Sequence, residues 1–343
     1  MDYTIEKRRR LAIIKKFKKK CINDNIIKLN AYYKKHKIII DNIDNRCLWK
    51  VIDNLCICGN LEVLKWLYSI DKINISESNY SVFVNCCRNG HIDIIKWINS
   101  LNIPNFPYFR GMSIACIDGN IKLAKYLYLI DNSITNEIYN CLFHLACMHG
   151  KLNIAEWLYS LAKFDINHKY IYENLIDNEE NSDYNLLYEK YNTFEHTCIF
   201  NNIEIAKWLY SLYKNDIHIE FNELVIDLCT FSSLEMIEWL YSLKDIVSEN
   251  YVYLPDNILY ECLYKTCSSY LHVYKLADWV YSGADDPKQK CKENCNKNYV
   301  RIAKWLYNFA PIDIRSNNDK LFKLVCRYKY DSIIEWLCSI CEL

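Results

Sequence analysis

Apolar side chains recur along most of this chain at the three- and four-residue spacing of amphipathic helices. The segment 151–161 places its leucine, isoleucine, alanine and tryptophan side chains on one broad face, with Lys, Asn, Glu and Ser opposite. A second apolar stripe over 141–147 precedes it. Gly150 separates the two stripes, and glycine accepts the left-handed backbone that ends a helix. The pattern predicts two short helices joined by a tight turn.

This two-helix pattern is an internal repeat, marked by a Trp-Leu-Tyr-Ser phrase in its second helix. The aromatic position of the nine copies is Trp66, Trp97, Tyr126, Trp157, Trp208, Trp239, Trp279, Trp305 and Trp336. A register cysteine stands ten residues earlier in eight copies (Cys56, Cys87, Cys116, Cys147, Cys198, Cys229, Cys295 and Cys326), and Cys267 stands twelve earlier in the seventh. One pair cannot bury both of its apolar faces alone, so neighbouring pairs should stack. We therefore predict an all-α helical-repeat solenoid of about nine helix-turn-helix units.

The repeat occupies residues 47–343 and is interrupted twice. Trp157 and Trp208 are 51 residues apart, where most copies are 29–31 apart, which predicts an insertion near 163–190. A second insertion is predicted near 282–298, where PKQKCKENCNKN replaces an apolar first helix. Residues 1–46 precede the repeat, and we expect them to form a basic N-terminal arm and a capping helical segment.

The segment FHLACMHGKLNIAEWLYSL (Phe143–Leu161) resembles an ankyrin repeat, and NCCRNGHIDIIKWINSL (Asn85–Leu101) is similar. The composition, rich in Ile, Asn, Tyr and Lys, also resembles that of the ankyrin-repeat proteins of giant amoeba-infecting DNA viruses. The Thr-Pro opening of the family is absent, and the period is shorter than the roughly 33 residues of typical ankyrin units. Tetratricopeptide-like helical pairs are the rival fold, although the glycine turns at 90, 119 and 150 favour ankyrin.

In ankyrin-like solenoids the partner binds along the concave face formed by the first helices, and the resemblance implies the same here. The positions that follow the register cysteines should then be exposed. We expect a protein-binding groove over units three to six, in which the apolar Met148, Ile199, Phe200 and Phe231 form the centre. Polar residues form its rim and complete the partner-binding set, namely Arg88, Asn89, Asp118 and His149. The alternative is that Phe200 and Phe231 fill turns of their own units, where Asn201 and Ser232 replace glycine.

The formal net charge is zero, yet the charge is distributed unevenly. Residues 1–37 hold 13 Lys and Arg against 3 Asp and Glu. The basic arm consists of Lys7, Arg8, Arg9, Arg10, Lys15, Lys16, Lys18, Lys19 and Lys20. Such a segment is typical of nuclear targeting, nucleic-acid binding or attachment to an anionic membrane, and equally of a solvated helix flank or tail.

The 18 cysteines invite a metal interpretation, but their spacing favours core packing. One register cysteine per unit stands where ankyrin repeats have a small buried residue, and free cysteine packs as a small apolar side chain. The pair Cys291 and Cys295 lacks a matching second pair for zinc. We find no metalloprotease, phosphate-loop or serine-hydrolase motif. We therefore expect no metal, no cofactor, no small-molecule substrate and no enzymatic activity.

No stretch reaches the roughly 18 consecutive apolar residues of a membrane span, and the start of the chain has no signal-peptide core. We expect a monomer in the cytoplasm, of the host cell if the protein is viral, with the nucleus possible through the basic arm. The leading interpretation is a non-catalytic protein–protein interaction scaffold that binds host proteins. The alternatives are an adaptor tethered to nucleic acid or to an anionic membrane by the arm, and a substrate receptor of a ubiquitin ligase.

Overall fold

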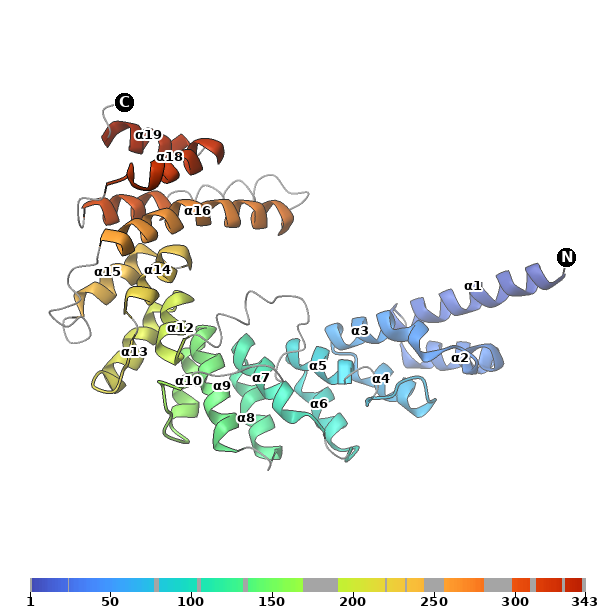
Figure 1. Ribbon diagram of the computed structural model, residues 1–343. Coiled ribbons are helices and arrows are strands. Elements are labelled where there is room, and N and C mark those ends of the chain that lie inside the picture. The colour runs from blue at the N-terminus through green and yellow to red at the C-terminus, as the bar shows by residue number, and fades with distance from the viewer. Residues whose placement is uncertain are drawn as a thin grey trace. The chain divides into compact units, whose positions relative to one another are not determined.

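The computed structural model is described over residues 2–23, 25–76, 80–103, 106–131, 135–168, 191–219, 221–231, 233–243, 256–280, 298–308, 313–328 and 331–340. Every regular element in these ranges is helical and none is a strand, which confirms the all-α prediction (Figure 1). Residue contacts divide the chain into two units. One consists of Met1–Ala146 with Asn153–Lys163, and the other of Cys147–Leu152 with Phe164–Leu343.

The first unit begins with two long helices and continues as short helical pairs. The long helices are α1 (Asp2–Asn23) and α2 (Ile26–Asp41), followed by the 3₁₀ turn η1 (Asn45–Leu48). The pairs are α3 (Trp49–Cys58) with α4 (Leu61–Ser69), α5 (Ser81–Arg88) with α6 (Ile92–Asn99), and α7 (Tyr108–Asp118) with α8 (Ile121–Ile130). The next pair is α9 (Asn136–Met148) with α10 (Leu152–Tyr159), and its turn belongs to the second unit.

The second unit continues the pairs. It contains α12 (Thr193–Ile199) with α13 (Ile203–Tyr213), α14 (Phe221–Phe231) with α15 (Leu234–Ser242), the long α16 (Asp256–Val280), a helix over 298–308, and α18 (Ser316–Tyr328) with α19 (Asp331–Ile340). The predicted insertion near 282–298 and most of the one near 163–190 lie outside the described residues.

The seventh copy departs from the predicted pair of short helices. The register Cys267 and the aromatic Trp279 both lie in the single helix α16, so the expected turn between them is absent. No glycine or proline occurs between these two residues, and the segment SSYLHVYKLAD contains nothing that ends a helix. The helix therefore continues through the place where other copies turn.

Glycine ends the first helix of the pairs in the first unit. Gly59, Gly90 and Gly119 have φ values of 70°, 71° and 84°, a left-handed region in which a side chain is unfavourable. The residue after the turn caps the next helix in two pairs. The side chains of Asn60 and Asn120 each accept a hydrogen bond from the backbone N–H three residues further on. These turns follow the sequence prediction.

The register cysteines lie in the core between successive first helices. Helices α3, α5 and α7 contact one another in chain order in the first unit, as do α12, α14, α16 and α18 in the second. The buried register cysteines, each at most 1% exposed, are Cys56, Cys87, Cys116, Cys147, Cys198, Cys229 and Cys267. Cys326 is exposed, so the packing interpretation is wrong for that copy, and Cys295 lies outside the described residues.

The tyrosine of the repeated phrase packs against the tryptophan of a later copy. In the first unit, Tyr68 meets Trp97 at a ring-centroid distance of 5.7 Å and an interplanar angle of 85°. In the second unit, Tyr210 meets Trp239 at 6.2 Å and 89°. Edge-to-face contact is the favoured geometry of aromatic pairs. The phrase therefore serves to pack one pair of helices on the next, as the sequence indicated.

Candidate interaction surfaces

Three of the predicted partner-binding residues are exposed on the first unit. Arg88 and Asn89 lie at the end of α5, and Asp118 lies at the end of α7. The neighbouring helix α3 adds Ile57, which is 54% exposed, and Trp49, which is 45% exposed. We call these five residues the first-helix face, because all of them belong to or directly follow the first helices of successive pairs.

Hydrogen bonds tie the helices of this face to one another. Asn85 Nδ2 in α5 donates to Asp53 Oδ1 in α3 over 2.9 Å. Trp49, Asp53 and Ile57 are spaced four residues apart, so they share one side of α3. At the following turn, a ring nitrogen of His91 lies 2.9 Å from the backbone oxygen of Ile57. The exposed side chains therefore stand on helices that are already packed together.

Trp49 was not predicted as a binding residue, because it stands outside the repeated phrase that contains the other tryptophans. Trp49 stands seven residues before the register Cys56, and Tyr80 and Phe109 hold the same place in the next two copies. The Tyr80 ring packs on Phe106, with centroids 5.1 Å apart. An aromatic side chain therefore recurs at this place, and only the structure shows that Trp49 is 45% exposed.

Met148 and Ile199 are buried, so the prediction that they are exposed groove residues is wrong. Their side chains are 1% and 2% exposed. Every residue of α12 is buried, including Glu195 at 2% exposure, so the spacing along this helix does not produce a solvent-facing side. Met148 ends α9, and its backbone oxygen accepts a hydrogen bond from Asn202 Nδ2 at 2.5 Å.

His149 and Phe200 are half-buried. Phe200 follows α12 as its C-cap residue, and its backbone N–H donates to the backbone oxygen of His196. The next residue, Asn201, adopts φ of 60° at the place where other copies have glycine. This geometry agrees with the alternative that Phe200 belongs to the turn of its own unit. The Phe231 side chain lies outside the described residues.

The basic arm is a packed helix, so its interpretation as a tail is wrong. Helix α1 contacts α2 and α3 and buries Ile13, Phe17 and Cys21. The Phe17 ring lies 6.2 Å from the ring of Trp66 in α4. Of the basic residues, Lys7, Arg8, Arg9, Arg10, Lys15, Lys16 and Lys19 are exposed, and Lys18 and Lys20 are half-buried. The helix therefore has an apolar side against the protein and a cationic side toward water.

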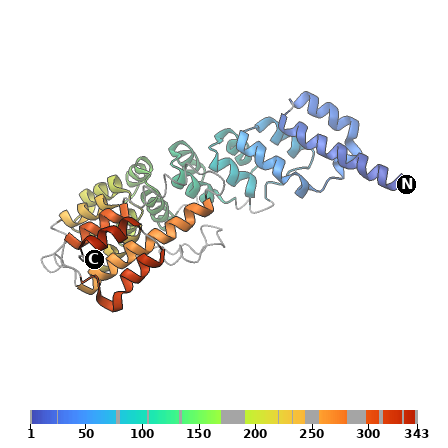
Figure 2. The same cartoon turned by 90° about the horizontal axis from the view of Figure 1, so that it is seen from above.

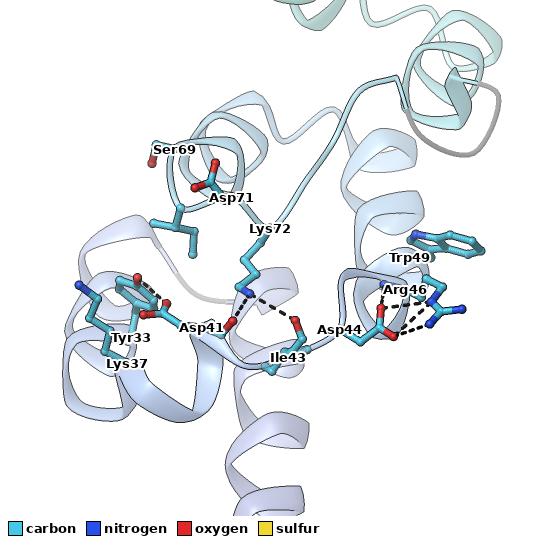
Figure 3. A pocket seen from close by; sticks show the side chains of 11 residues that line it. Tyr33, Lys37, Asp41, Ile43, Asp44, Arg46, Trp49, Ser69, Asp71 and Lys72 are labelled. Atoms are coloured by element: carbon cyan, nitrogen blue, oxygen red, sulfur yellow. Dashed lines mark hydrogen bonds and ion pairs between the residues drawn. The ribbon is translucent and has the colours of Figure 1, made fainter.

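An open hollow lies beside the C-terminal end of α2 (Figure 3). The Tyr33 hydroxyl donates to Asp41 Oδ1 over 2.8 Å. Lys72 is only 5% exposed, and its Nζ donates to the backbone oxygens of Asp41 (2.7 Å) and Ile43 (3.2 Å). A cation is favourable here because the last carbonyls of a helix carry partial negative charge. Lys72 thereby joins the loop after α4 to the end of α2.

Two further charged residues of the hollow, Asp44 and Arg46, are bound to each other. Asp44 accepts from the Arg46 backbone and pairs with the Arg46 guanidinium, whose closest nitrogen is 2.9 Å away. These hydrogen bonds from Arg46 lower the pKa of Asp44. Burial and the hydrogen bond to Asp41 raise the pKa of Tyr33. We interpret the hollow as a structural junction, because Lys72 joins the loop after α4 to the end of α2 there.

Among the described residues, no group of three His, Cys, Asp or Glu side chains could hold a metal ion. Within the same ranges, no helix is long and apolar enough to cross a bilayer. Neither protein-family models nor curated proteins show a match to this sequence.

Proposed function

We propose that this chain is a non-catalytic scaffold that binds a partner protein through the first-helix face. The observation that carries the proposal is the joint exposure of Trp49, Ile57 and Arg88 on successive packed helices. Tryptophan and arginine are the residue types that most often dominate the energy of protein interfaces. The packing of α3 against α5 supports tight binding, because helices that are already ordered lose little conformational entropy when a partner docks.

We further propose that the repeats are of ankyrin type, as the resemblance implies. The left-handed glycine turns at Gly59, Gly90 and Gly119 support this proposal, as do the buried cysteines at the small-residue position. The resemblance to ankyrin-repeat proteins of giant amoeba-infecting viruses suggests a protein of the infected host cell as the partner. The proposed binding face lies on the first three helical pairs, whereas the sequence predicted a groove over units three to six.

The test is affinity capture from amoebal lysate with two matched double variants. Ile57→Asp with Arg88→Glu changes the first-helix face, and both side chains are exposed. Leu129→Asp with Lys122→Glu makes the same chemical changes on α8, where both side chains are also exposed. Circular dichroism and the melting temperature establish that both proteins are folded.

We expect the wild type and the α8 variant to capture the same partner protein. The variant of the first-helix face should fail to capture it. Removal of two interface hot spots typically weakens binding by at least about 30-fold. A partner that the face variant retains at wild-type affinity would place the binding surface elsewhere. Loss in both variants would mean that the capture depends on overall charge.

A further inference from the structure

The hairpin of α1 and α2 lies at one end of the first unit (Figure 2), and it carries an excess of positive charge, since residues 1–37 hold 13 Lys and Arg against 3 Asp and Glu. Arg8, Lys15 and Lys19 are exposed and lie seven and eleven residues apart, so they share one side of α1. The opposite side contains the buried Ile13 and Phe17. On α2, Lys28, Lys34, Lys35 and Lys37 are exposed as well.

Other cations of α1 hold the hairpin together. Arg10 Nη2 donates to the backbone oxygen of Asn42 over 3.4 Å. The Nζ atoms of Lys16 and Lys20 lie 5.8 Å and 5.5 Å from the centre of the Tyr32 ring in α2, within the range of cation–π contacts. The two helices of the hairpin are therefore held together by contacts between their side chains and backbone. The outer side of α1 exposes Arg8, Lys15 and Lys19.

Aliphatic side chains are exposed among these cations. Ile38 at 81% and Ile27 at 76% are the two most exposed large apolar side chains in the described part of the chain, and both belong to α2. Leu11 and Ile22 of α1 are 57% and 42% exposed. Single exposed apolar residues are ordinary, whereas four of them on two adjoining helices indicate a surface that another apolar phase covers.

We propose that the α1–α2 hairpin docks on the surface of an anionic lipid bilayer. The lysine and arginine side chains bind the negatively charged headgroups, and Ile27 and Ile38 enter the interfacial region. The proposal goes beyond protein binding through the first-helix face, because it assigns a second surface with a different partner. It would hold the scaffold at a membrane while the first-helix face binds protein.

The same cations could attract nucleic acid, but the apolar residues favour lipid. Phosphate contacts gain nothing from exposed isoleucine, and proteins that bind single-stranded nucleic acid commonly add aromatic side chains on which bases stack. The aromatic side chains that the structure describes in α1 and α2 contact other groups of the protein. Phe17 is buried, Tyr33 packs on Trp66, and the ammonium groups of Lys16 and Lys20 lie over the Tyr32 ring.

The experiment is vesicle co-sedimentation of the full chain with phosphatidylcholine alone and with added phosphatidylserine. One variant carries Arg8→Gln, Lys15→Gln and Lys19→Gln, and a second carries Ile27→Gln and Ile38→Gln. The matched controls are Lys65→Gln, Lys122→Gln and Lys163→Gln for charge, and Leu129→Gln with Leu161→Gln for apolar surface. All ten side chains are exposed, so each protein should fold, which circular dichroism verifies.

We expect the wild type and both controls to bind only vesicles that contain phosphatidylserine. The charge variant should bind about a hundredfold more weakly, and the isoleucine variant about tenfold more weakly. Equal losses in the charge controls would overturn the proposal. It also fails if the isoleucine variant binds like the wild type, or if the protein binds duplex DNA or RNA and no vesicles.

Discussion

Tyr33 of α2 meets Trp66 of α4 edge-on, with ring centroids 5.5 Å apart and ring planes at 88°. Tyr68 and Trp97 adopt nearly the same geometry one pair later, at 5.7 Å and 85°. In addition, α1 contacts α3 and α2 contacts α4. The hairpin therefore takes the place of a preceding repeat, although its sequence lacks the repeated phrase. It covers the apolar side of the first pair, as a terminal capping repeat does.

Removing the Tyr33 ring should destabilise this cap. We expect Tyr33→Ala to lower the free energy of unfolding by about 2 kcal/mol, because the aromatic contact and its packing are lost. Tyr33→Phe keeps the ring and loses only the hydrogen bond to Asp41, so it should cost about 0.5–1 kcal/mol. Urea unfolding followed by tryptophan fluorescence measures both. Equal effects of the two substitutions would show that the ring contact does not stabilise the cap.

The hydrogen bonds that Lys72 donates should stabilise the folded protein. Lys72→Met preserves most of the side-chain volume but leaves the backbone oxygens of Asp41 and Ile43 without this donor. We expect the free energy of unfolding to fall by about 2 kcal/mol. The exposed Lys65→Met is the matched control and should change stability by less than about 0.5 kcal/mol. Similar values for the two variants would contradict the joining role of Lys72.

A substitution of Gly59 should destabilise the protein partly through a clash with His91. A Cβ on Gly59 would lie 2.6 Å from two atoms of the His91 ring, and φ of 70° disfavours a side chain in any case. Gly59→Ala should therefore cost more than the roughly 1 kcal/mol of the backbone term. In a His91→Ala background the cost should shrink by at least about 0.5 kcal/mol, because the clash is absent. Additive costs in this double-mutant cycle would mean that the ring moves aside freely.

Stability should fall at alkaline pH. Burial raises the pKa of Cys21 from 9.0 to about 12, and it raises the pKa values of Cys87 and Cys116 as well. The folded state thus keeps protons that the unfolded state releases, so the stabilisation is complete below pH 9 and is lost as the pH rises above it. Each such thiol contributes a slope of about 1.4 kcal/mol per pH unit. Urea midpoints in this range should fall less steeply for Cys21→Ala, and an unchanged slope would contradict this assignment.

The repeated packing contacts could be predicted because each one repeats a physical constraint. A cysteine ten residues before an aromatic residue places both on sides that neighbouring pairs cover, as Cys56 and Trp66 illustrate. The serine of the phrase has a local role that the sequence alone did not reveal. Ser69 Oγ donates to the backbone oxygen of Trp66 over 2.7 Å, and Ser100 and Ser160 do the same in their copies. It satisfies a carbonyl at the end of the second helix.

The surface could not be predicted to the same degree, because helical periodicity does not say what lies against each side. Met148 and Ile199 occupy the same register as Arg88, yet they are buried and Arg88 is exposed. The repeat register, which is based on Cys267 and Trp279, predicted two short helices where the structure has the single helix α16. The register does not reveal that the segment between these residues lacks a glycine or proline to end the first helix. The exposed Ile27 and Ile38 lie outside the repeat, where no pattern drew attention to them.

Site-specific photo-crosslinking tests the proposed binding face most directly. A benzophenone amino acid is placed at position 57 in one protein and at position 129 in another, because both native side chains are exposed and apolar. After irradiation in amoebal lysate, the account predicts a covalent adduct with one partner protein from position 57, and its loss when Arg88→Glu is added. Adducts with the same partner from position 129, or none from position 57 while capture persists, would contradict binding through the first-helix face.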